Sequence, residues 1–144
     1  MFEKSFIDKD IRFFRYIDDI IAFNCDNFLE IAKDIYPKEL VLKQTNLVSS
    51  VNFLDLLISL DGNAWVIGLY DKRLDFNFKV NSLTNWRSCI SKKVLKNILT
   101  SQFTRIFNIC NSKVTLNKAL NNLFSCAIGN GFPNTVTSSF KICE

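Results

Sequence analysis

The chain contains no histidine, and only one methionine, two prolines and four glycines are spread over its 144 residues. Without histidine, neither a Ser-His nor a Cys-His nucleophile can be assembled. Any catalysis would therefore depend on carboxylates, lysine or a bound metal ion. No apolar run approaches the roughly 20 residues that a helix needs to cross a bilayer, so the sequence predicts no membrane partner.

Cysteine occurs five times, but no two cysteines have the short spacing of a zinc site. An odd number of scattered cysteines argues against both a disulfide framework and a structural zinc site. The pattern favours a reducing intracellular compartment, nuclear or cytoplasmic. The five positions are Cys25, Cys89, Cys110, Cys126 and Cys143.

Negative charge is scarce in the second half of the chain. Residues 1–71 carry 7 Lys/Arg and 12 Asp/Glu, a net charge of −5, whereas residues 72–144 carry 11 and 2, a net charge of +9, which sum to +4. A basic half suits a protein that binds a polyanion, and an ordinary solvated basic surface is the alternative. With 48% hydrophobic residues, the chain can bury the core of one small domain or of part of a larger one.

Two adjacent acids, Asp18 and Asp19, lie between two apolar and aromatic runs. The pattern predicts antiparallel strands at about 12–17 and 20–24, with both acids at the hairpin tip. Neighbouring carboxylates repel each other, so a divalent cation is the expected partner if both stay ionised. Such a site suits phosphoryl or nucleotidyl transfer, and an ordinary solvated turn is the alternative.

The rest of the first half alternates between helix and strand patterns. Asp55 lies inside one predicted apolar strand, where it is either a third metal ligand or a structurally paired acid. The predicted elements are a helix at 28–36 that Pro37 ends, a strand at 40–45, and hairpin strands at 53–60 and 64–70 around Asp61-Gly62.

In the second half, cations alternate with aromatic residues in a predicted loop at 71–86. Cations attract phosphates and aromatic faces stack on bases, although the aromatics could equally pin the loop to the core. Ser91 is the predicted N-cap of a basic helix ending near 109, and a second helix is predicted at 114–128. Because the lysines lie mostly on the first helix, they favour contact with a duplex backbone over groove reading.

The sequence therefore predicts an α+β protein, with antiparallel hairpins and a helix followed by a basic helical hairpin. Residues 1–70 form the first predicted domain and 71–130 the second, and a flexible tail is expected over 131–144.

Four short motifs follow in an order that resembles the reverse transcriptases of Penelope-like retroelements. Tyr16-Ile17-Asp18-Asp19 is similar to their catalytic box, and residues 52–58 resemble their Phe-Leu-Asp box. Residues 69–73 are similar to the entry of the thumb, and the helix after Ser91 resembles the first thumb helix. The resemblance implies the C-terminal part of a polymerase palm followed by a thumb.

The resemblance implies that Asp18 is a ligand of Mg²⁺ (or Mn²⁺) and that Asp19 is the supporting acid. It also implies that Tyr16 lies beside the incoming nucleotide or the primer end. It implies a fragment of a retrotransposon RNA-directed DNA polymerase that acts on an RNA template, a DNA primer and deoxynucleotides. The family's upstream aspartate and fingers have no counterpart in the 15 residues before Tyr16, so the fragment is expected to be inactive alone. The residues expected to bind nucleic acid are Tyr70, Lys72, Arg73, Lys79, Lys92, Lys93 and Lys96.

Two other hypotheses remain open, and with them the question of whether the chain is an enzyme. The first is a non-enzymatic nucleic-acid-binding module, similar to a helix-turn-helix and built on the basic helix pair. The second is a small α/β interaction protein, whose affinity for nucleic acid would show no salt dependence.

Overall fold

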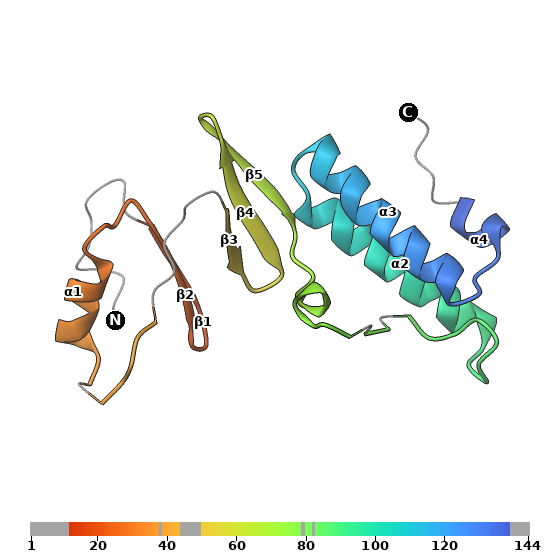
Figure 1. Cartoon of the computed structure of the whole chain (residues 1–144), viewed down its shortest axis with the longest axis horizontal. Coiled ribbons are helices and arrows are strands. Elements are labelled where there is room, and N and C mark those ends of the chain that lie inside the picture. The colour runs from red at the N-terminus through yellow and green to blue at the C-terminus, as the bar shows by residue number, and fades with distance from the viewer. Residues whose placement is uncertain (1–11, 38, 44–49, 79, 82, 139–144) are drawn as a thin grey trace.

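The computed structural model describes residues 12–37, 39–43, 50–78, 80–81 and 83–138. Apart from α1, the strands precede the helices, and all paired strands are antiparallel, which confirms the predicted α+β class (Figure 1). The elements are β1 (Arg12–Tyr16), β2 (Asp19–Phe23), α1 (Phe28–Ile35), β3 (Ser50–Phe53), β4 (Leu56–Asp61), β5 (Ala64–Leu69), the 3-10 helix η1 (Lys72–Asp75), α2 (Lys92–Ile109), α3 (Lys113–Gly129) and α4 (Asn134–Ser138).

The strands form two small sheets. β1 and β2 pair as an isolated hairpin, and β3, β4 and β5 form a sheet in that order. The ring of Phe23 meets the ring of Trp65 edge to face at 5.4 Å and so joins the hairpin to the sheet. In Figure 1 the hairpin and α1 lie at one end, the sheet lies in the middle, and α2 and α3 lie at the other end.

Two strand predictions were wrong. The single strand predicted at 53–60 is split by a tight turn, because Phe53 pairs with Leu56 and the chain reverses at Leu54 and Asp55. Leu54 has a φ of 54°, a left-handed conformation that the apolar sequence does not predict. The strand predicted at 40–45 is also absent from its described part, 40–43, where Val41 is 82% exposed and no neighbouring strand pairs with it.

The predicted helical hairpin is confirmed. Ser91 accepts a hydrogen bond from the amide of Val94, so it caps α2 as predicted. Ser112 caps α3 in the same way by accepting from the amide of Thr115 at 3.2 Å. Part of the tail that was expected to be flexible, 131–144, forms α4, which packs against α3.

The hydrophobic core lies in the helical part. α2 and α3 run side by side in opposite directions, and their apolar stripes face a shared interior (Figure 1). Among the described residues before 79, only Ala32 and Ile58 are buried hydrophobic residues. The buried core is Leu83, Leu95, Leu99, Ile106, Leu120, Leu123, Ala127 and Phe132.

The helices dock on the sheet at the outer edge of β5. Asn111, in the turn between α2 and α3, accepts a hydrogen bond from the amide of Ile67 at 2.8 Å and donates to the carbonyl of Trp65 at 2.8 Å. The backbone amide of Asn111 donates to the carbonyl of Ile67 at 3.2 Å. Asn111 therefore pairs with β5 much as another strand would, and it covers part of that edge.

Candidate nucleic-acid interface

The hairpin expected to bind metal presents one acid at its tip, not both. Asp18 lies in the turn, whereas Asp19 begins β2 and pairs with Tyr16, which ends β1. All three side chains are exposed. Among the described residues, no three Asp, Glu or Cys side chains gather into a metal-binding group. Within the described part of the chain no third acid joins Asp18 and Asp19, and metal binding by these two residues stays a prediction.

Two of the predicted nucleic-acid-binding residues near β5 are held by acids of the same chain. Arg73 donates through Nε and Nη2 to the two carboxylate oxygens of Asp71, each at 2.6 Å. This hydrogen bonding lowers the pKa of Asp71 and raises the pKa of Arg73. The hydroxyl of Tyr70 donates to Asp75. Lys72 is exposed, and Lys79 lies outside the described residues.

Trp86 is the aromatic residue that pins the loop to the core. Its ring lies 5.1 Å from the ring of buried Phe132, and its amide donates to the carbonyl of Asn130 at 2.9 Å. Lys92 lies over the Trp86 ring at 5.0 Å and also donates to the Trp86 carbonyl, so this lysine supports the loop. Phe76 and Phe78 instead contact each other and are largely exposed.

Lys93 and Lys96 are exposed on α2, Lys93 on the side opposite the buried leucines and Lys96 beside them. Residues at intervals of three or four continue along that side of the helix. We call this surface the α2 polar face, and it contains no carboxylate. It is formed by Lys93, Lys96, Asn97, Thr100, Ser101, Thr104, Arg105 and Asn108.

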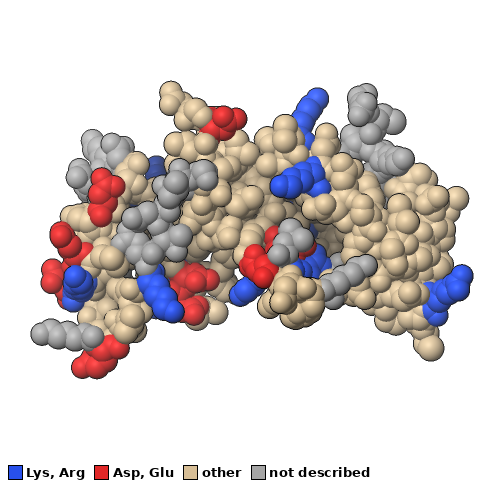
Figure 2. Space-filling model, viewed as in Figure 1, with Lys and Arg blue, Asp and Glu red and all other residues tan. Residues whose placement is uncertain are grey.

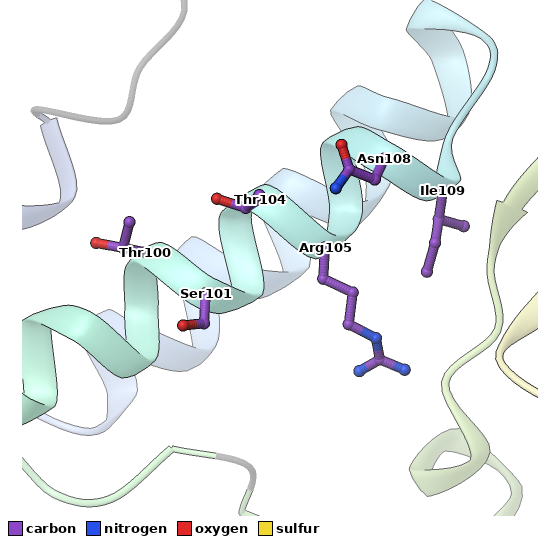
Figure 3. A pocket seen from close by; sticks show the side chains of 6 residues that line it. All are labelled: Thr100, Ser101, Thr104, Arg105, Asn108 and Ile109. Carbon is purple, nitrogen blue, oxygen red and sulfur yellow. The ribbon is translucent and has the colours of Figure 1, made fainter.

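An open hollow of about 480 Å³ lies along this face (Figure 3). The hydroxyls of Ser101 and Thr104 and the amide of Asn108 line it and make no hydrogen bond to the described residues, so all three are available to a ligand. The hydroxyl of Thr100 donates to the carbonyl of Lys96 at 3.0 Å. The hollow is lined by Thr100, Ser101, Thr104, Arg105, Asn108 and Ile109.

Arg105 connects the α2 polar face to the sheet. Figure 3 shows its side chain extending away from α2. Its Nη2 lies 2.5 Å from a carboxylate oxygen of Asp55, in the turn between β3 and β4. The positive charge of Arg105 also helps to lower the pKa of Asp71. Arg105 therefore interacts with two acids from two other segments, Asp55 and Asp71. Asp55 is therefore a paired acid, the second of the two roles considered for it.

The sequence interpretation missed the uncharged part of the α2 polar face. It identified Lys93 and Lys96 but not the hydroxyls of Ser101 and Thr104 or the amide of Asn108. Their spacing opposite the leucine stripe was the available signal, since residues three and four apart share one side of a helix. All six residues that line the hollow belong to α2, so helical periodicity alone could have grouped them.

The helical part is basic throughout. Residues 82–140 contain seven Lys/Arg and no Asp/Glu. Figure 2 shows the same asymmetry, with acidic side chains over the hairpin, α1 and the sheet, and only basic ones over α2 and α3. The connection between the two antiparallel helices is three residues long, Cys110 to Ser112, a length typical of an αα-hairpin.

Comparison with known protein families gives one match. A family model described as an animal helix-turn-helix domain matches residues 82–140, the range that contains α2, α3, α4 and the hydrophobic core. No curated protein and no solved structure matches the chain. None of the helices in the described part of the chain has both the length and the hydropathy needed to span a bilayer. The match favours nucleic acid as the partner.

The expectation of a reverse transcriptase fragment was wrong. The family match is to a helix-turn-helix domain, and no reverse transcriptase family matches. The structure also departs from the expected palm, because the Phe-Leu-Asp segment is a tight turn and the hairpin with Asp18 forms no larger sheet with the described strands. The alternative, a nucleic-acid-binding module built on the helix pair, is the better supported hypothesis.

Proposed function

We propose that this protein is a nucleic-acid-binding helix-turn-helix module, and that the α2 polar face contacts the sugar-phosphate backbone. The observation that carries the proposal is the overlap of three features. The helix-turn-helix match at 82–140 contains the whole buried core and lies within a stretch, 76–143, that has no Asp or Glu. A polyanion is the partner that such a region attracts over distance.

The chemistry of the α2 polar face supports a phosphate ligand. Lys93 and Lys96 carry full positive charges in solvent, and Ser101, Thr104 and Asn108 add uncharged donors along the same side of the helix. Lysine, hydroxyl and amide groups supply most protein contacts to phosphate oxygens. Such contacts set affinity and position without reading sequence. The intracellular location expected from the cysteines, nuclear or cytoplasmic, is compatible with this role.

The test is the salt dependence of nucleic-acid binding by the full chain, measured by fluorescence anisotropy with a labelled duplex of mixed sequence. Affinity should fall steeply between roughly 50 and 200 mM salt, because each phosphate contact releases condensed counterions. Replacing both Lys93 and Lys96 by glutamine should weaken binding and reduce the log–log salt slope by about two.

A matched control has Lys33 and Lys43 replaced by glutamine. Both residues are exposed and precede the helical part, so the variant loses the same charge elsewhere. This control should keep nearly the wild-type salt slope. Affinity that is insensitive to salt, or equal losses in the two variants, would contradict the proposal.

A further inference from the structure

The outward side of α3 differs chemically from the α2 polar face. Six exposed residues repeat at intervals of three or four, and only one of them is charged. We call this surface the α3 amide face, because two asparagines lie at its centre one helical turn apart. It is formed by Val114, Asn117, Lys118, Asn121, Ser125 and Ile128.

The side chains of Asn117 and Asn121 make no hydrogen bond to any described residue. Three other asparagines of the helical part take part in side-chain hydrogen bonds, whereas Asn97, Asn108 and Asn122 make none to a described residue, like Asn117 and Asn121. Asn111 bonds to β5, the amide of Asn130 donates to the carbonyl of Cys126 at 2.8 Å, and Asn85 accepts from the amide of Arg87. The two amides of the α3 amide face thus keep both their donors and their acceptors available.

Asparagine in the middle of an exposed helix is locally unfavourable. Its side chain competes with the backbone for hydrogen bonds, and it is a poorer helix former than alanine, lysine or glutamine. Asn117 and Asn121 lie well inside α3, away from both caps, and gain no hydrogen bond there in return. Residues that break a local rule without structural compensation are expected at functional sites.

We propose that the α3 amide face reads A·T base pairs in the major groove of duplex DNA, with Asn117 and Asn121 binding adenine. This inference rests on the proposed function and names its substrate class. Asparagine is a matched bidentate partner of adenine, because its side-chain N–H donates to N7 and its side-chain oxygen accepts from N6, and an apolar side chain recognises the thymine methyl group. Val114, 78% exposed, is the apolar residue nearest to these amides on the face.

The dimensions of α3 agree with this assignment. Val114 and Asn121 are seven residues apart, or about 10 Å along the helix, which is close to three base-pair steps. Lys113 immediately precedes this stretch and Lys118 lies within it, and both supply charge for the neighbouring phosphates. The absence of carboxylates from 82–140 removes the side chains that most commonly accept from cytosine N4. Duplex RNA does not fit, because its major groove is too deep and narrow for a helix.

The experiment is a selection of binding sites by the full chain from a randomised duplex DNA library. The wild type should enrich sites with neighbouring A·T pairs. Replacing both Asn117 and Asn121 by alanine should reduce the preference for these pairs by roughly 5- to 100-fold per position, while salt-dependent binding to mixed sequence stays within about twofold. The melting temperature of this variant should equal or exceed that of the wild type, because alanine favours helix.

Two controls separate base reading from general effects. Asn122→Ala changes the next residue, which lies roughly 100° further around α3, and should keep the preference. Val114→Ser, which replaces the apolar side chain by a polar one, should abolish the preference for thymine over uracil at the selected site. An enriched site without A·T pairs, an unchanged preference in the Asn117 and Asn121 variant, or equal affinity for duplex RNA would overturn the inference and leave the proposed function standing. The complete absence of nucleic-acid binding would overturn both.

Discussion

Asp55 and Arg105 form an ion pair that joins the turn between β3 and β4 to α2, with 2.5 Å between the carboxylate and guanidinium atoms. The pair is the point at which the acidic first half of the chain touches the α2 polar face. Both side chains are partly exposed, at 64% and 40%, so solvent screens their attraction. The pair therefore matters more for the availability of Arg105 to phosphate than for stability.

Replacing Asp55 by asparagine should increase nucleic-acid affinity, because Arg105 is then free to bind a phosphate. We expect a gain of roughly three- to tenfold at low salt, with less than about 1 kcal/mol lost in unfolding free energy. Anisotropy titrations and urea melts measure the two quantities. Asp61→Asn is the control for the charge change alone, since Asp61 lies in β4 and is exposed. Equal gains in both variants would show that Arg105 is not involved.

Replacing Asn111 by alanine should loosen the attachment of the helices to β5. The substitution removes two side-chain hydrogen bonds to the backbone at Trp65 and Ile67. Because Asn111 is exposed, water can replace part of the loss, and we expect a decrease of about 1 kcal/mol in unfolding free energy. Hydrogen exchange should become faster at the Ile67 amide. The nearby Asn108→Ala, which removes no hydrogen bond, should cause no loss of stability.

Replacing Gly68 by alanine should destabilise the contact between β5 and α3. The added methyl group would lie 3.2 Å from Cγ2 of Thr115, and the Thr115 side chain is held in place by hydrogen bonds to Ile67 and Ser112. Overpacking of this kind costs about 1–3 kcal/mol. Gly129→Ala is the matched control, because nothing lies within 4 Å of its added carbon. Thermal melts in which the two variants behave alike would contradict this account.

The pair of Asp71 and Arg73 should make stability depend on acid pH. Hydrogen bonding to Arg73 lowers the pKa of Asp71 below its ordinary value of 3.8 in the folded state. The contribution is therefore complete above the unfolded-state pKa and disappears as the pH falls through the folded-state pKa. Urea melts at about pH 6 and about pH 3 should show a larger loss for the wild type than for Asp71→Asn. Because the pair is partly exposed, the difference should stay below about 1 kcal/mol.

The sequence by itself determined the local structure of the helical part. Ser91 and the recurring leucines predict α2 within a few residues, because capping and helical periodicity act over only three or four positions. The excess of basic residues also indicated a polyanionic partner without any structure. The first-half motif around Asp18 misled the interpretation, because a hairpin tip with two acids is compatible with both a metal site and a solvated turn.

Only the tertiary structure decided which long-range contacts form. Asp55 meets Arg105 fifty positions later in the chain because the left-handed Leu54 reverses the strand, and neither event leaves a local signal. The same holds for Asn111, whose hydrogen bonds depend on the free edge of β5 lying against the helix turn. Sequence patterns encode what neighbouring residues prefer, whereas the pairing of distant segments depends on the shapes and charges that folding brings together.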